Sequence, residues 1–248
     1  MDPKDIQYFK NWFYLYVKSF HSDNPEFQRN IDLKEQHTRR VVQEALDIGK
    51  DLGLAEDDLR LAEVTALFHD VGRFEQYRRF GTFSDRHSVN HAEFGIDILR
   101  KERVMDRLDP PLKDLILEVI AWHNRPRLPE TGDSRWLMLS RLLRDADKMD
   151  IWRVVTEYYE RKETGEKNAA IELDLPDTPG LSRAVVESMI QGKPALLEDT
   201  KNLNDFKLLQ VGWVYDVNFS PTLTRLKARG YLDKIRKALR DAGDVAGI

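Results

Sequence analysis

The stretch EDDLRLAEVTALFHDVGR, residues 56–73, joins an apolar helical pattern directly to a His-Asp pair. Its apolar side chains recur at helical spacing, and the acidic residues at its start suit the positive end of a helix dipole. We therefore predict a helix over residues 56–69, with Gly72 breaking the pattern. His69 and Asp70 follow the apolar face at once, so we expect them at the edge of a core. Burying them without partners would cost several kcal/mol, and metal binding would remove that cost.

The rest of the chain is also mostly helical by its amphipathic spacing. Further helices are predicted over residues 5–20, 31–52, 90–103, 111–123, 134–163, 181–191 and 221–240, and near 204–214. Residues 134–163 form one long helix or two in line, and Gly53 caps the helix over 31–52. Loops are predicted at residues 21–28, 75–89 and 124–134, where proline, glycine and polar residues gather. Residues 164–180 are polar with an apolar island at 169–175, and the tail at 241–248 is expected to fray. Strand patterns are scarce, so the sequence predicts an all-α fold.

Composition limits the function classes. The formal net charge of -4 gives no basic face for a long nucleic acid, although a metal can still hold a small anionic substrate in an acidic protein. The absence of cysteine excludes disulfides, thiolate metal sites and a cysteine nucleophile. The charged amino-terminal stretch does not resemble a signal peptide, and no apolar run is long enough for a membrane span. We expect a cytoplasmic protein.

Six residues combine histidine and carboxylate in a pattern that suits metal ions. They are His37, His69, Asp70, His91, His123 and Asp147. They come from several predicted helices or helix ends, which is how a helical protein builds an inward-facing metal site. Four imidazoles and two carboxylates, one of them bridging, suit two divalent ions of Mn, Fe, Co, Ni or Zn. The alternative is a single ion, with His91 and His123 contacting the substrate.

This set resembles the HD-domain metal-dependent phosphohydrolases. The matching residues are His37 in QHTRRVV, His69-Asp70 in LFHDVGR and Asp147 in LLRDADKMD. The two-metal branch of that family adds two histidines, which His91 in NHAEFG and His123 in IAWHNR match. The resemblance covers roughly residues 35–155. No domain boundary is predicted at residues 164–180, so we expect one domain over 1–248. In that domain a helical metal-binding core would carry helical extensions, residues 1–30 and 165–248, packed on it.

The resemblance also implies which residue holds which ion. His37, His69, Asp70 and Asp147 would hold the first ion, and Asp70 would bridge to a second held by His91 and His123. Asp145 is the alternative to Asp147. We prefer Asp147, because the family's aspartate commonly follows a small residue and precedes a basic residue and another acid.

The implied reaction is attack of a metal-activated hydroxide on phosphorus. Asp70 would take part through both ions. Arg73 and Lys148 are candidates to bind phosphate oxygens, although Arg73 could equally form a structural salt bridge and Lys148 could be solvated. His87 or Asp85 could act as acid or base, with a loop role as the alternative for His87. Other basic candidates are Arg78, Arg79, Arg125 and Arg127.

Three functions remain open at this point. The first is hydrolysis of a phosphate ester or anhydride, with a nucleotide or related small molecule as substrate. The second is a di-iron oxygenase on the same helical scaffold, and the third is a noncatalytic module that binds metal and ligand. The basic residues near the motifs favour the first. The Glu-Asp pair of the alarmone branch and the Gly-Tyr-Pro signature of the cyclic-dinucleotide branch are both missing, so those substrates are disfavoured.

Overall fold

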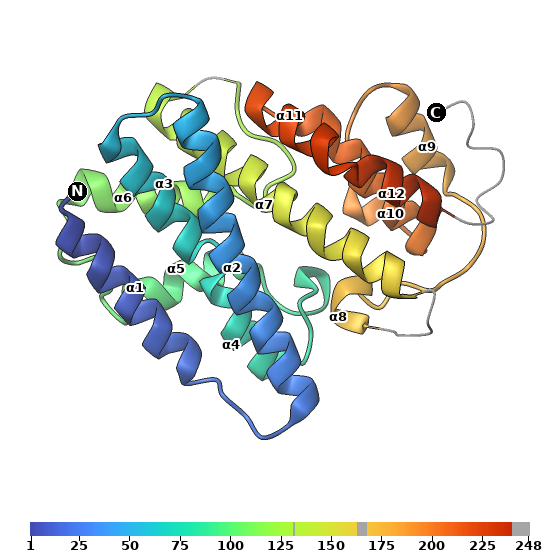
Figure 1. Ribbon diagram of the computed structural model, residues 1–248. Coiled ribbons are helices and arrows are strands. Elements are labelled where there is room, and N and C mark those ends of the chain that lie inside the picture. The colour runs from blue at the N-terminus through green and yellow to red at the C-terminus, as the bar shows by residue number, and fades with distance from the viewer. Residues whose placement is uncertain (131, 163–167, 240–248) are drawn as a thin grey trace. The chain divides into compact units, whose positions relative to one another are not determined.

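The computed structural model describes residues 1–130, 132–162 and 168–239, and every regular element in these ranges is a helix (Figure 1). The α-helices are α1 Pro3–Lys18, α2 Pro25–Asp51, α3 Glu56–Phe68, α4 Val71–Phe80, α5 His91–Lys101, α6 Pro110–Trp122, α7 Ser134–Lys162, α8 Ala169–Glu172, α9 Arg183–Ile190, α10 Leu203–Gly212, α11 Ser220–Arg229 and α12 Tyr231–Ala238. Three short 3-10 turns are η1 Asp85–His87, η2 Leu197–Asp199 and η3 Trp213–Asp216. The predicted all-α fold is confirmed.

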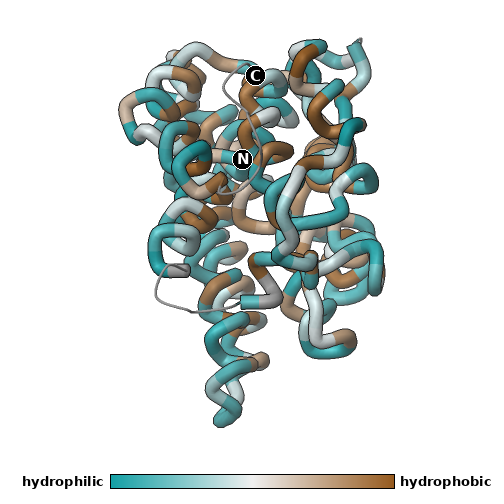
Figure 2. The backbone as a smooth tube through the Cα atoms, turned by 90° about the vertical axis from the view of Figure 1, so that its right-hand side faces the viewer, coloured by the Kyte–Doolittle hydropathy of each residue, from teal (hydrophilic) through white to brown (hydrophobic). Residues whose placement is uncertain are grey.

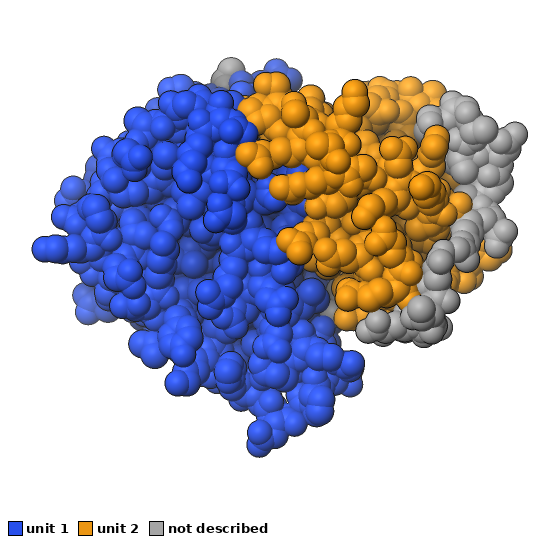
Figure 3. All heavy atoms as spheres, in the orientation of Figure 1, with its two compact units in different colours: residues 1–150 blue, residues 151–248 orange. Residues whose placement is uncertain are grey.

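The chain divides into two compact units, residues 1–150 and 151–248 (Figure 3). The division falls inside α7, directly after Asp150. All six residues of the predicted metal set belong to the first unit. The expected arrangement of one domain, with residues 165–248 packed on the core, stays a prediction.

In the first unit, four helix pairings assemble the core. Helix α2 packs on α3, α4 packs on α5, and α6 contacts both α3 and α5 (Figure 1). Apolar and polar residues are mixed along the helices, as the changes of colour along the tube in Figure 2 show. Their buried apolar faces form the core around which the helix ends meet.

Helix α1 covers part of this core with aromatic side chains. Phe9 meets the ring of Phe68 edge to face, and Phe13 meets Phe74 in the same way. The helix begins at Pro3 rather than at the predicted residue 5, because Asp2 and Asp5 form a capping box at its first turn. The aromatic stripe therefore serves core packing.

Helix α2 begins earlier than its periodicity predicts. The side chain of Asn24 accepts hydrogen bonds from the backbone of Glu26 and Phe27, and Pro25 occupies the first helical position. Residues 25–28, predicted as a loop, are thus the first turn of the helix. At the other end Gly53 takes the left-handed conformation (φ 71°) beyond the last turn, as predicted for a cap.

The prediction of a loop from residue 75 onward is wrong, because α4 continues to Phe80. The chain breaks instead at Asp70 (φ -105°, ψ 14°), between α3 and α4. Gly72 does not end a helix; it lies where α4 crosses α5. A Cβ atom there would lie 2.2 Å from the carbonyl oxygen of His91 and 2.7 Å from the backbone nitrogen of Gly95. Glycine is needed for the close approach of two backbones, a tertiary requirement that periodicity does not reveal.

The second unit is built around α10, where all residues but Val211 are buried. Its core cluster consists of Val185, Met189, Ala195, Phe206, Leu208 and Leu209. The predicted island at 169–175 supplies α8, and Leu173 and Leu175 pack against that cluster. The single helix predicted over 221–240 is two helices, because Gly230 (φ 63°) ends α11 and begins α12. The expected fraying tail lies outside the described residues.

Candidate metal centre

Six side chains from five helices or helix ends converge in the first unit. His37 lies within α2, His69 and Asp70 occupy the break between α3 and α4, and His91 is the first residue of α5. His123 caps the carboxyl end of α6, and Asp147 lies within α7. These are the six residues singled out in the sequence, and they form two clusters that share Asp70.

The first cluster joins His37, His69 and Asp147. The Nε2 atoms of His37 and His69 lie 3.3 Å apart. The Oδ1 atom of Asp147 lies 3.1 Å from Nε2 of His37 and 3.7 Å from Nε2 of His69. The Oδ2 atom of Asp70 completes the group, at 3.5 and 3.7 Å from the same two nitrogens.

The second cluster joins His91 and His123 to the other oxygen of Asp70. The two Nε2 atoms lie 3.0 Å apart. The Oδ1 atom of Asp70 lies 3.3 Å from Nε2 of His91 and 4.0 Å from Nε2 of His123. Asp70 therefore directs one oxygen to each cluster, which is the geometry of a bridging carboxylate.

Each of the four imidazoles is held through its Nδ1 atom. Nδ1 of His69 and Nδ1 of His123 each lie 2.7 Å from a backbone carbonyl oxygen, that of Ala66 and that of Ile120. A carbonyl oxygen only accepts hydrogen bonds, so the proton of each neutral ring is on Nδ1 and the lone pair is on Nε2.

Carboxylates hold the other two rings in the same way. Oδ2 of Asp150 lies 2.7 Å from Nδ1 of His37, and Oδ2 of Asp85 lies 2.6 Å from Nδ1 of His91. All four Nε2 atoms consequently face the clusters. Metal-binding histidines typically donate their second N–H to a carboxylate or carbonyl in this manner.

The donor set and its spacing fit first-row divalent ions. Two donors at about 2.1 Å from one ion lie about 3.0 Å apart at a right angle and about 3.4 Å apart at the tetrahedral angle. The closest pairs in the two clusters, at 3.0, 3.1 and 3.3 Å, fall in that range. Imidazole and carboxylate without thiolate suit Mn, Fe, Co, Ni or Zn.

The two aspartates of the clusters are held in their charged form. Burial opposes ionisation of Asp70, but Lys34 and the other positive groups around it hold its pKa well below the usual range. Burial also opposes ionisation of Asp147, yet hydrogen bonds from His37 and His69 hold its pKa well below the usual range too. One buried and one half-buried carboxylate, both ionised, therefore lie at the place where cations would bind.

The histidines differ in their affinity for protons. Burial favours the neutral form of His37, but its hydrogen bonds to two carboxylates raise its pKa to about 9. Burial and the neighbouring His91 and His69 lower the pKa of His123 to about 3. Burial and Arg73 also lower the pKa of His91. Without metal, His37 in the first cluster therefore carries an extra proton, whereas His91 and His123 in the second cluster stay neutral.

Two arginines neutralise the outer carboxylates. Arg40 binds Asp150 with two hydrogen bonds, Nε to Oδ1 at 2.5 Å and Nη2 to Oδ2 at 3.1 Å. Nη1 of Arg73 lies 2.8 Å from Oδ1 of Asp85, and Nε of Arg73 lies 3.4 Å from Oδ1 of Asp70. The structure thus shows the salt bridges expected as the alternative for Arg73, and Asp85 orients His91. Phosphate binding by Arg73 stays a prediction.

The other predicted catalytic residues lie elsewhere around the clusters. His87 is exposed in η1. Lys148 is buried and follows Asp147 directly on α7, so the two side chains leave the helix in different directions. Their catalytic roles stay predictions. Of the two aspartates weighed as the last ligand, Asp147 lies in the first cluster, while Asp145 is fully buried on the same helix.

Three residues that support the clusters were not predicted from the sequence: Lys34, which contacts Asp70, Asp150, which contacts His37, and Arg40, which binds Asp150. Lys34 and Arg40 lie three residues before and after His37, and Asp150 lies three residues after Asp147. Side chains at this spacing share one face of a helix. Scanning that face around each proposed ligand would have identified all three.

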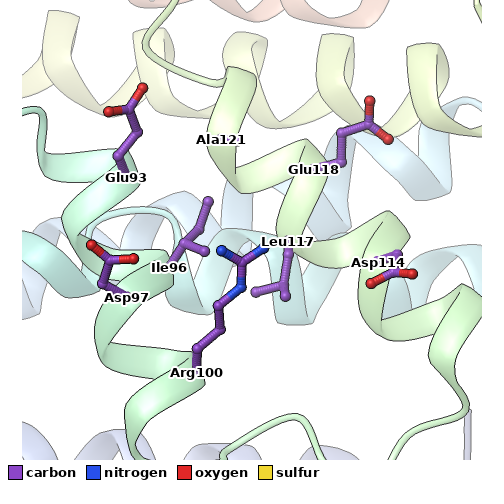
Figure 4. A pocket seen from close by; sticks show the side chains of 8 residues that line it. All are labelled: Glu93, Ile96, Asp97, Arg100, Asp114, Leu117, Glu118 and Ala121. Carbon is purple, nitrogen blue, oxygen red and sulfur yellow. The ribbon is translucent and has the colours of Figure 1, made fainter.

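A separate surface pocket lies between α5 and α6, where the side chain of Arg100 extends between the two helices (Figure 4). Its lining consists of Glu93, Ile96, Asp97, Arg100, Asp114, Leu117, Glu118 and Ala121. None of these residues belongs to the two clusters. Four carboxylates against one guanidinium give this pocket the wrong charge for a phosphate.

The comparisons with known proteins agree with the geometry. Residues 35–152 match the family model described as HD domain, and this range includes both clusters and Asp150. No curated protein and no solved structure gave a match. The order of the histidines and aspartates, their convergence in space and the family match lead to the same assignment. This chain therefore contains an HD domain at residues 35–152, and its cluster of histidines and aspartates fits the metal site of that family.

Proposed function

We propose that this protein is a metal-dependent phosphohydrolase that cleaves a phosphate ester or anhydride of a small molecule, with nucleotides as the first candidates. The observation that supports it most is that Asp70 directs one oxygen to each of two histidine pairs. The HD domain supports it as well, because proteins of this family are generally metal-dependent phosphohydrolases. The donors would hold two divalent ions with Asp70 between them.

The bound ions would activate water as the nucleophile and polarise the phosphoryl group. The chain itself holds the ligands in place before the ions arrive. Asp150, Asp85 and two backbone carbonyls fix the four rings, so little reorganisation is needed when metal binds. Five of the six side chains are buried and Asp147 is half-buried, which limits the contact of bulk water with the charges.

Charge favours an anionic substrate. Two divalent ions bring four positive charges, and the clusters contain only the two carboxylates of Asp70 and Asp147. Asp85 and Asp150 do not add to these, because Arg73 and Arg40 neutralise them. A phosphate group would balance the surplus. The net charge of -4 on the whole chain favours a small substrate over a long nucleic acid.

Metal analysis followed by an activity screen tests the proposal. The purified protein would be reconstituted separately with Mn²⁺, Co²⁺, Ni²⁺, Zn²⁺ and Fe²⁺ and offered nucleoside mono- and polyphosphates and simple phosphate esters. We expect release of phosphate or pyrophosphate with at least one metal, and its loss in Asp70→Asn. Asp97→Asn is the matched control, since Asp97 lies on α5 outside both clusters.

The same experiment separates the rival functions. A di-iron oxygenase would consume dioxygen in the Fe²⁺ sample and release no phosphate from any compound. A noncatalytic module would bind metal and nucleotide without turnover. Either result would overturn the assignment as a phosphohydrolase.

A further inference from the structure

Lys34 lies between solvent and the first cluster, one helical turn before His37 on α2. Its Nζ atom lies 2.8 Å from Oδ2 of Asp70, the oxygen that faces the first cluster. The Lys34 side chain is 18% exposed, and its ammonium lies over the ring of Phe83, 5.2 Å from the centroid. The charge is therefore held at the edge of the cluster, within reach of a molecule entering from outside.

Two arginines beside the clusters have separate acidic partners. Arg40 pairs with Asp150, and Arg73 pairs with Asp85. Three further arginines predicted from the sequence as candidate phosphate ligands are also engaged. Arg78 and Arg79 both pair with Glu75, and Arg125 pairs with Glu93. In the described part of the chain, Lys34 pairs only with Asp70, which is also the shared ligand of the proposed metal pair.

Metal binding changes the surroundings of Lys34 more than those of any of these arginines. Once Asp70 shares its charge with two divalent ions, little of that charge is left to balance the ammonium. The arginines keep their own carboxylates. A lysine beside a surplus of positive charge is stabilised by an additional anion.

We propose that Lys34 is a substrate-binding residue that donates a hydrogen bond to an anionic oxygen of the phosphate group in the metal-loaded protein. This inference rests on the proposed function and adds one specific contact to it. The ammonium contacts the carboxylate of Asp70 in the metal-free protein and the substrate phosphate in the loaded protein. The ammonium stays over the ring of Phe83, so only its hydrogen-bond acceptor changes.

The test measures binding of inorganic phosphate to the full-length protein loaded with Mn²⁺, by isothermal titration calorimetry. Lys34→Met keeps the length of the apolar stem and removes the charge, and Lys34→Arg restores a charge. We expect Lys34→Met to weaken phosphate binding about 10- to 100-fold, the range for the loss of one charge-assisted hydrogen bond. Lys34→Arg should recover most of the affinity. Lys50→Met, an exposed lysine on the same helix, should bind phosphate like the wild type.

A second measurement separates substrate binding from a structural role. Lys34→Met should bind Mn²⁺ at least as tightly as the wild type, because Asp70 loses a competing cation. If Lys34→Met lost Mn²⁺, or bound phosphate as tightly as the wild type, the proposal would be wrong. It would also be wrong if the loaded wild type bound no phosphate. Phosphate binding through Lys34 without hydrolysis of any phosphorylated compound would instead reject the proposed function alone.

Discussion

The carboxylate of Asp150 lies 2.7 Å from Nδ1 of His37 and fixes the ring so that Nε2 faces the first cluster. The two residues are far apart in sequence, on α7 and α2, and Arg40 holds the carboxylate from its other side. This contact makes Asp150 a positioning residue for the metal centre, although it does not itself face the other donor atoms.

Replacing Asp150 should weaken metal binding without removing a ligand. Asp150→Ala leaves Nδ1 of His37 without its acceptor and Arg40 without its partner, so the ring loses its fixed orientation. Losing such a contact typically lowers metal affinity by about 10- to 100-fold. Competition with a fluorescent chelator would measure the change. Glu157→Gln, an exposed ion-pair residue on α7, is the control, and equal affinities in both variants would exclude a positioning role.

Metal uptake should release a proton from the first cluster. The pKa of His37 is raised to about 9, so at pH 7 the ring must lose a proton before Nε2 can bind an ion. Apparent affinity for the first ion should therefore rise about tenfold per pH unit from pH 7 up to about 9. Calorimetry in buffers of different ionisation enthalpy would count the proton. A metal affinity that does not change between pH 7 and about 9 would contradict the release of a proton from His37.

The raised pKa of His37 also makes the stability of the metal-free protein depend on pH. A histidine whose pKa is raised on folding adds stability in full below its unfolded value, which is about 6.5. That contribution is lost as pH rises through about 9. Urea unfolding with a chelator present should thus give a free energy of unfolding that falls between pH 6.5 and 9. His37→Gln should remove this part of the dependence.

The number of bound ions should be two, because Asp70 directs one carboxylate oxygen to each cluster. We expect two ions per wild-type chain, one in His91→Ala, and neither held tightly in Asp70→Ala, which also should lose turnover. Elemental analysis after dialysis measures the ratio, with Asp97→Ala as the control. One ion per wild-type chain would support the mononuclear alternative, in which His91 and His123 contact the substrate.

Gly72→Ala should be strongly destabilising and should disturb the second cluster. The added Cβ would meet the backbone of His91 and Gly95, which cannot move aside without separating α4 from α5. We expect a loss of about 3 kcal/mol in the free energy of unfolding, at the upper end for an overpacked site. Gly49→Ala is the matched comparison, because its Cβ would meet the end of the Leu59 side chain at 2.8 Å. A flexible side chain can shift, so Gly49→Ala should lower the free energy of unfolding by less than Gly72→Ala does. Chemical denaturation of both variants would measure the difference.

The sequence by itself determined the helical class and the members of the candidate site. Both depend on local information: amphipathic spacing reveals a helix wherever one face is buried, and the His69-Asp70 pair after an apolar run marks polar groups at the edge of a core. The predicted end of a helix was correct where a glycine cap such as Gly53 gave a local signal. The prediction was wrong at α4, which continues past Gly72, because that glycine is needed for a contact with another helix, the crossing with α5.

Only the tertiary structure decided how the site is divided and supported. The assignment of one Asp70 oxygen to each histidine pair depends on where α2, α5, α6 and α7 meet. So do the contacts of Asp150 with His37, Asp85 with His91, and Lys34 with Asp70. These are interactions between side chains from different helices, and their direction depends on the packing of those helices. Periodicity along one helix shows which face is buried, but it does not show which side chain of another helix that face will meet.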